Sequence, residues 1–158
     1  MRRMLSLIVV FGSLIATTPF AQAADPIKMA GNLSYFRKGG VVDLSCGQIA
    51  NYRSSTLMSG TLVLQLMAAT SSTATPKAVT FKMCEVQIGK LQGHTYRNNV
   101  KASALFKAPT PGTYYILFVL SEWNGVKYVP IDWYMFSNPK KFTTTSPFQF
   151  QFERIPGT

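Results

Sequence analysis

The sequence predicts an all-β protein, built as an antiparallel β-sandwich. Three observations lead to this fold class: apolar and polar residues alternate with a period of two, helical periodicity is hard to find after residue 24, and turn signals separate the alternating segments at short intervals. Such spacing is typical of two packed antiparallel sheets. We expect seven to eight strands, at residues 33–37, 41–50, 61–68, 79–88, 96–106, 113–122, 126–135 and 147–154.

A secretory signal peptide is expected ahead of the strands, at residues 1–23. Two arginines follow the first methionine, an apolar run spans residues 5–15, and Ala21-Gln22-Ala23 matches a small-x-small cleavage site. The apolar run is shorter than the roughly 20 residues of a spanning helix. We therefore expect cleavage, one domain at residues 24–158, a periplasmic or secreted bacterial location, and no transmembrane segment after cleavage.

The early strands each have one apolar face. In the second strand, Val42, Leu44 and Cys46 share a face and polar residues stand opposite, and three leucines do the same in the third strand. Alternation is looser in the fourth strand. Residues 69–78 are mostly small and polar, which favours a mobile loop before that strand.

The later strands differ in character. The sixth is apolar on both faces along Tyr114–Leu120, which is typical of a central strand. Pro130 cannot donate to a sheet, so we expect the seventh strand at an edge or with a bulge. In the last strand Phe148, Phe150 and Phe152 alternate with polar residues. That strand could complete its own sheet or pair with another chain, which leaves an oligomer open.

The sixth and seventh strands are expected to form a hairpin. Asn124-Gly125 between two β-rich segments is the preferred pair for a two-residue type I′ turn. That register would place Trp123 opposite Val126 and Glu122 opposite Lys127. The second of these is an opposite-charge pair, worth a few tenths of a kcal/mol across an antiparallel ladder.

Two cysteines remain after the signal peptide, Cys46 and Cys84. In an exported protein such a pair indicates one disulfide, here closing a loop of about 38 residues and contributing roughly 3 to 4 kcal/mol. Two thiols and the distant His94 fall short of a tetrahedral metal site. We expect no metal and no cofactor.

The charge of the mature chain favours acidic partners or a plain solvated surface. Residues 24–158 contain 14 Lys and Arg against 6 Asp and Glu. The resulting positive field attracts polyanions, such as an anionic surface polysaccharide or an acidic protein. The basic residues are scattered along the chain, however, and no run of four or more occurs. Export makes nucleic acid an unlikely partner.

No catalytic constellation is found, so we expect no enzyme and no catalytic residue. The only histidine, His94, follows a glycine turn, and no Gly-x-Ser-x-Gly motif occurs. Asp132 is unusual because it stands within an apolar strand. A hydrogen-bonded structural role is the favoured explanation for it, and a catalytic role is the alternative.

Four residues around the hairpin are the binding candidates: Trp123, Lys127, Tyr128 and Trp133. Exposed aromatic rings on a rigid sheet serve sugar stacking or protein contact, since they provide contact area at a low entropy cost. By alternation Trp133 falls on the same face as Ile131, so it is the candidate for the core, and Trp123 at the hairpin is the candidate for exposure.

Three segments resemble an immunoglobulin-like module of bacterial exported proteins, akin to the cell-adhesion-related domains. They are the Ser-Gly-Thr-Leu strand within residues 58–68, the Leu-Gly-x-Leu-x-Gly-like turn at 88–93, and Pro-Gly-Thr-Tyr leading into 111–136. The resemblance covers residues 49–137. It implies an immunoglobulin-like sandwich and a binding or adhesive function, and it supplies no catalytic residues.

Together these observations predict an exported, non-catalytic protein that binds a protein partner or an anionic surface glycan. Two other classes stay open. One is a small inhibitor or immunity-type protein that acts on an exported enzyme. The other is a hydrolase with an unrecognised carboxylate site, which would need a second carboxylate near Asp132.

Overall fold

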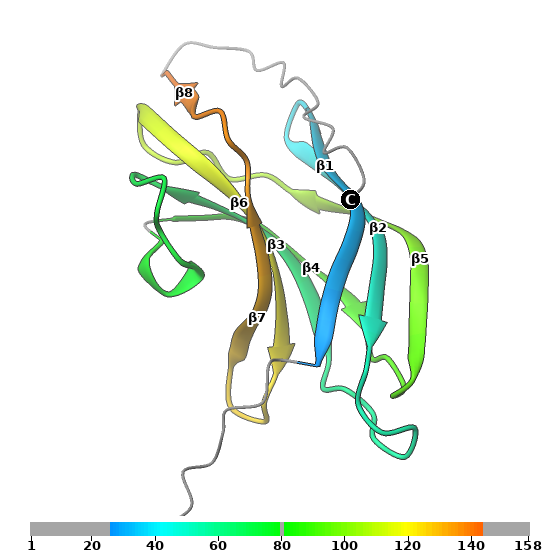
Figure 1. Cartoon of the computed structure of the whole chain (residues 1–158). Helices are drawn as coiled ribbons and strands as arrows, with labels where there is room; N and C mark the ends of the chain where they lie inside the picture. Colours follow the sequence, from blue (N-terminus) through cyan, green and yellow to red (C-terminus); the bar gives the residue numbers. More distant parts are fainter. Residues whose placement is uncertain (1–25, 80, 144–158) are drawn as a thin grey trace, which may run out of the picture.

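Eight strands and one short 3-10 helix make up the part of the chain that the computed structural model describes, residues 26–79 and 81–143 (Figure 1). The strands are β1 (Ile27–Lys38), β2 (Val41–Asn51), β3 (Leu62–Ala69), β4 (Phe81–Gly89), β5 (Thr95–Leu105), β6 (Gly112–Trp123), β7 (Tyr128–Met135) and β8 (Lys140–Phe142). The helix, η1, spans Pro76–Ala78. None of these residues forms a helix long and apolar enough to cross a membrane.

The strands form two antiparallel sheets (Figure 1). One has the order β1-β2-β5. The other has the order β4-β3-β6-β7, with β8 paired to the first residues of β6. The chain passes from the first sheet to the second after β2, returns after β4 and passes over again after β5. The all-β, antiparallel part of the predicted fold class is confirmed.

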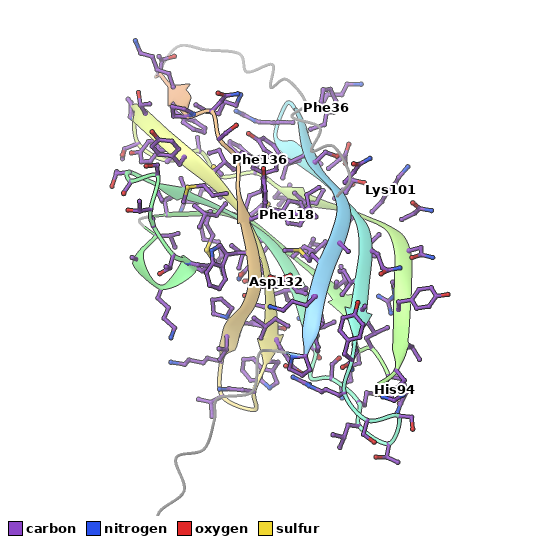
Figure 2. The ribbon with its side chains drawn as sticks, viewed as in Figure 1. Phe36, His94, Lys101, Phe118, Asp132 and Phe136 are labelled. Atoms are coloured by element: carbon purple, nitrogen blue, oxygen red, sulfur yellow. The ribbon has the colours of Figure 1, made fainter. Side chains whose placement is uncertain are left out.

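One hydrophobic core lies between the two sheets. Leu44 of β2, Leu66 of β3 and Phe118 of β6 belong to it and are almost completely buried. Figure 2 shows Phe118 and Phe136 in the space between the sheets. The alternation read in the second and third strands therefore marks the residues that face this core.

The outer face of the five-stranded sheet carries a second, smaller apolar cluster, which includes Met67 and Leu117. Ala74 and Val79 pack against it, so the segment between β3 and β4 covers this part of the sheet. Because β6 is covered on both faces there, both of its faces are apolar. The segment predicted to be a mobile loop thus packs on the sheet and contains η1, with Pro76 buried.

The predicted strand positions hold to within a few residues for β2 to β6. The first strand begins six residues earlier than predicted, because a register shift between Ala30 and Leu33 hides its alternation. The three-residue β8 was not predicted, since so short a strand shows no period. The predicted signal peptide, residues 1–23, and the predicted strand 147–154 lie outside the described residues.

The β6–β7 hairpin forms, but its predicted two-residue turn is wrong. Trp123 pairs with Tyr128 and Glu122 with Val129, which leaves a four-residue loop. The Asn124 side chain closes this loop, since its Oδ1 accepts hydrogen bonds from the backbone N–H groups of residues 126 and 127, at 3.0 and 2.9 Å. Glu122 therefore does not face Lys127. Its carboxylate binds Arg53 instead.

The predicted disulfide is also wrong, because Cys46 and Cys84 are free thiols and both are buried. Cys46 lies on β2, the middle strand of its sheet, whereas Cys84 lies on β4, an edge strand of the other sheet. A disulfide needs Cα atoms within about 7 Å and converging Cβ vectors. The middle of one sheet and the edge of the other do not lie opposite each other, so the two thiols fill separate parts of the core.

We expect both thiols to resist alkylation in the folded protein. Burial raises the pKa of Cys46 and of Cys84 to about 11, so both are protonated and shielded at pH 8. Iodoacetamide should add nothing to the native protein and two groups after unfolding in guanidinium without reductant. Mass spectrometry checks this. An unfolded, unreduced protein that takes up no label would show that the disulfide exists.

Candidate functional site

An aromatic patch lies on the outer face of the five-stranded sheet, the face turned away from β1-β2-β5. Trp123 and Tyr128 pair across the hairpin, with ring centroids 5.1 Å apart and an interplanar angle of 62°. Trp133 stands opposite Val119, whose side chain belongs to the outer apolar cluster. Alternate residues of a strand share a face, so Val119 and Trp123 point the same way. We call Trp123, Tyr128 and Trp133 the aromatic patch.

Both tryptophans of the patch remain open to solvent. Trp123 is 40% exposed and Trp133 is 46% exposed. The inward position predicted for Trp133 is wrong, because the β6–β7 register shifts at Ser121 and leaves Ile131 as an extra residue on β7. This bulge turns Ile131 into the core and Trp133 outward. The edge strand with a bulge, predicted from Pro130, is confirmed.

Tyr128 is held in place by a residue that the sequence analysis missed. Gln87 Nε2 donates a hydrogen bond to Tyr128 Oη at 3.0 Å. Gln87 is on β4 and Tyr128 on β7, so the two side chains meet above β3 and β6, the strands between them. Val63 on β3 and Ser121 on β6 lie in the same row of the sheet as Gln87, and both are buried. The phenol ring is therefore fixed across the sheet.

A ladder of hydrogen bonds continues beside the patch on this outer face. Ser121 Oγ donates to Gln65 Oε1 at 2.8 Å, and Gln65 Nε2 donates to Glu85 Oε2 at 2.5 Å. Lys82 Nζ also binds Glu85 Oε2, at 2.7 Å. Burial raises the pKa of Glu85, but the hydrogen bonds from Lys82 and Gln65 outweigh it and lower that pKa. The carboxylate is thus ionised, and the ladder stiffens β6, β3 and β4.

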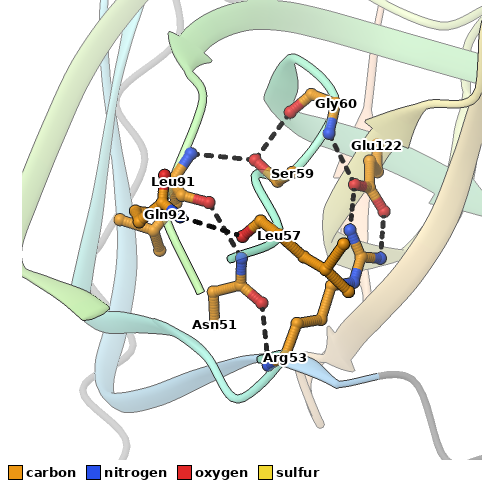
Figure 3. Close-up of polar contacts among 8 residues, drawn as sticks. All are labelled: Asn51, Arg53, Leu57, Ser59, Gly60, Leu91, Gln92 and Glu122. Atoms are coloured by element: carbon orange, nitrogen blue, oxygen red, sulfur yellow. Dashed lines mark hydrogen bonds and ion pairs between the residues drawn. The ribbon is translucent and has the colours of Figure 1, made fainter. Parts of the chain in front are cut away.

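Behind the patch, a partly buried junction joins the two sheets (Figure 3). Arg53, just after β2, binds both oxygens of Glu122 on β6, at 2.5 and 2.6 Å. The Gly60 N–H donates to Glu122 Oε1 at 2.7 Å, and the Trp123 N–H donates to the carbonyl of Thr61 at 2.9 Å. Burial raises the pKa of Glu122, and the contacts with Arg53 and Gly60 more than reverse this, so its pKa is lowered.

Further hydrogen bonds complete the junction around Asn51, Ser59 and Leu91. Asn51 Nδ2 donates to the Leu91 carbonyl at 2.8 Å, and Asn51 Oδ1 accepts from the Arg53 N–H at 3.1 Å. The Leu91 N–H donates to Ser59 Oγ at 2.8 Å, and that hydroxyl donates to the Gly60 carbonyl. These bonds fix the chain where it passes between the sheets (Figure 3). Because Gly60 also binds Glu122, they set the end of β6, which carries Trp123.

Three other residues singled out in the sequence lie outside the aromatic patch. Lys127 is exposed in the hairpin loop beside the patch, and His94 is exposed before β5. Asp132 accepts a hydrogen bond from the Met29 N–H at 2.7 Å and lies 3.7 Å from Lys28 Nζ, so it joins β7 to β1. Within residues 26–79 and 81–143, no three His, Cys, Asp or Glu side chains gather as a metal site would require.

The arrangement offers flat rings, fixed amides and nearby cations, which suit stacking and hydrogen bonding to a ligand. When the chain is compared with models of protein families, with curated proteins and with solved structures, no match is found.

Proposed function

We propose that this protein is an exported, non-catalytic binding protein that holds an anionic glycan on the aromatic patch. One observation carries the proposal: both tryptophans of the chain lie on one outer sheet face and stay about half exposed. Large rings left in solvent on a rigid sheet are available for stacking against sugar rings. Their contact area comes at a low entropy cost, because few rotatable bonds must be fixed on binding.

The patch is organised before any ligand arrives. Trp123 packs edge-on against Tyr128, and Gln87 holds the Tyr128 hydroxyl. The junction and the bulge at Ile131 set the directions of the two indole rings. A surface that needs no rearrangement loses less free energy on binding.

Charge favours an anionic ligand over a neutral one at this patch. Residues 24–158 contain 14 Lys and Arg against 6 Asp and Glu. Glu122 is paired with Arg53 and Glu85 with Lys82, so the two carboxylates near the patch are already compensated. Lys127 adds an exposed positive charge next to Tyr128. Acidic groups of a polysaccharide would be attracted there, and the attraction would weaken with salt.

The strand order supports an immunoglobulin-like domain of the adhesion type. Labelled A, B, C, C′, E, F and G in chain order, β1 to β7 form the sheets A-B-E and C′-C-F-G. Tyr114, near the start of the F strand, has its hydroxyl 3.0 Å from the Thr110 hydroxyl upstream, whereas in a tyrosine corner that hydroxyl bonds upstream backbone. In immunoglobulin domains a disulfide joins strands B and F. Here Cys46 is on B but Cys84 is on C′, and the F strand carries the buried Phe118 in the core.

Export is supported by the pattern of residues 1–23, and an exported domain would be located where surface glycans occur.

Two described carboxylates are engaged in structural contacts. Asp132 binds Met29 and Lys28, and Asp43 accepts a hydrogen bond from Ser103. These contacts favour binding over hydrolysis as the role of the domain.

The test is a titration that follows tryptophan emission. Since both tryptophans are in the patch, dextran sulfate, alginate or polygalacturonate should shift the emission, and uncharged dextran should not. Trp133→Ala should weaken the affinity by about 2 kcal/mol, or roughly 30-fold, which is typical of a central aromatic contact. Leu105→Ala, at an exposed position on β5, is the matched control and should bind like the unchanged protein.

Two results would overturn the proposal. One is unchanged emission with all three anionic polymers, and the other is an equal loss of affinity in the Leu105 and Trp133 variants. Recovery from culture medium of one protein, at low and high salt alike and dependent on Trp133, would instead favour the inhibitor class.

A further inference from the structure

We propose a second ligand site on the opposite sheet, where Tyr52 and Tyr96 flank a depression suited to a neutral oligosaccharide. The depression has a volume of about 310 Å³ and lies at the end of β2 and the start of β5. Its lining includes Gln48, Ala50 and His94. Figure 2 shows His94 at the end of the three-stranded sheet.

The lining residues face away from the core. Ile49 is buried between the sheets, so its neighbours Gln48 and Ala50 point to the outer face of β1-β2-β5. Tyr96 pairs directly with Ala50 across the β2–β5 ladder. Tyr52 is the first residue after β2, which ends at Asn51, and it lies two residues along the chain from Ala50. A small side chain between two large ones creates the hollow, with Ala50 as its floor.

The two phenol rings are the exposed aromatic surfaces of this hollow. Tyr52 is 64% exposed and Tyr96 is 63% exposed. Their backbones are fixed nonetheless: the Tyr52 N–H donates to the Pro26 carbonyl at 2.7 Å, and Tyr96 lies within the β2–β5 ladder. Exposed rings on an anchored backbone can stack on the flat face of a sugar without reordering the chain.

An amide pair beside the rings supplies directional hydrogen bonding. Gln48 Nε2 donates to Asn98 Oδ1 at 2.9 Å, and the two residues are direct partners in the ladder. This bond orients both amides, so Gln48 presents its carbonyl oxygen and Asn98 its N–H groups to the outside. An acceptor and a donor held side by side match two neighbouring hydroxyl groups of a sugar ring.

The depression carries no fixed charge, although the chain as a whole is strongly basic. No Asp, Glu, Lys or Arg is among the described residues that line it. Two cations are next to lining residues along the chain, and both bind elsewhere. Arg97 reaches the carbonyls of Ile88 and Lys90 at the end of β4, and Arg53 binds the Glu122 carboxylate. A neutral ligand therefore fits this site better than an acidic one, in contrast to the aromatic patch.

The two sites lie on opposite faces of the domain, one on each sheet. A single molecule could then hold two glycan chains at once, and the effective concentration of the second chain would rise. This bridging rests on the proposed function of the aromatic patch. The neutral site itself depends only on residues within or next to β2 and β5.

The test uses three neutral hexasaccharides, cellohexaose, maltohexaose and hexa-N-acetylchitohexaose, with two readouts. Backbone amide signals in a proton–nitrogen NMR spectrum should move around Tyr52 and Tyr96 for at least one sugar, at up to about 10 mM. Tryptophan emission should stay constant, because both tryptophans are on the other sheet. Tyr96→Ala should reduce the affinity at least tenfold, and Trp133→Ala should leave it unchanged.

Leu105→Ala is again the control, since it is exposed on the same strand as Tyr96 but outside the depression. Absence of shifts near Tyr52 and Tyr96 with all three sugars would overturn the second site. Shifts that vanish in the Trp133 variant and persist in the Tyr96 variant would overturn it too. Failure of the anionic titration would leave this result unaffected, so the two proposals fail separately.

Discussion

Replacing Gly60 by alanine is expected to lower the free energy of unfolding by about 3 kcal/mol. A Cβ atom at this position would lie 2.0 Å from the Trp123 carbonyl oxygen and 3.2 Å from Cγ of Glu122. The first neighbour is backbone and cannot rotate away, so the end of β6 must move. The cost combines overpacking, about 1 to 3 kcal/mol, with damage to the hydrogen bond between the Gly60 N–H and Glu122.

The measurement is guanidinium unfolding of Gly60→Ala beside Gly40→Ala. At Gly40, in the β1–β2 turn, a new Cβ meets nothing within 4 Å, and the backbone does not require glycine. That variant should match the unchanged protein or gain up to about 1 kcal/mol from the less flexible unfolded chain. Equal transition midpoints for the two alanine variants would refute the close approach at Gly60. Displacement of Trp123 should also weaken binding of anionic polymers to folded Gly60→Ala.

Much of the fold could be predicted because its signals are local. Alternation in β2 and β3 and the apolar run of β6 depend on neighbouring residues of one strand. The start of β1 could not be predicted in this way, because Gly31, with a φ of +73°, lies in the bulge that breaks its period. The turn at Asn124 was misjudged for a related reason: the asparagine side chain closes a longer loop, which the dipeptide preference does not reveal.

The candidate site was predictable in its residue types but not in its assembly. Trp123, Tyr128 and Trp133 stand out as aromatic residues near a hairpin, and the structure brings them onto one face. Gln87 could not be singled out, because its contact with Tyr128 depends on the order of four strands. The disulfide prediction was wrong for the opposite reason. Two cysteines in a chain that is expected to be exported favour a disulfide, and the placement of their strands overrides that expectation.

Stability and the candidate site meet at the end of β6. Glu122 and Trp123 are consecutive, so one strand end carries both an anchor of the junction and a ring of the aromatic patch. The anchor faces the inside of the protein and the ring faces solvent, as strand alternation requires. A change at the anchor should therefore reach the patch through the backbone of β6.

Glu122→Gln is expected to destabilise the protein by about 2 to 3 kcal/mol at pH 7. The change removes the charge that faces Arg53 in a place where the two side chains are 12% and 23% exposed. Breaking a fully buried pair by changing one partner costs about 3 to 5 kcal/mol, and partial exposure reduces that figure. Glutamine keeps the size of the side chain, so packing alone does not explain the loss. Urea unfolding of both proteins across a range of pH provides the measurement.

The difference between glutamate and glutamine at position 122 should depend on pH in one direction. The Glu122 pKa is lower in the folded protein than its ordinary value of 4.5. The stabilisation is therefore complete above about pH 5 and is lost as the pH falls through the folded-state pKa, because both states then bind the proton. Asp43→Asn, which alters an exposed carboxylate bound to Ser103, should cost under about 1 kcal/mol at pH 7. A constant difference from pH 7 to pH 2 would mean that the carboxylate charge does not stabilise the junction.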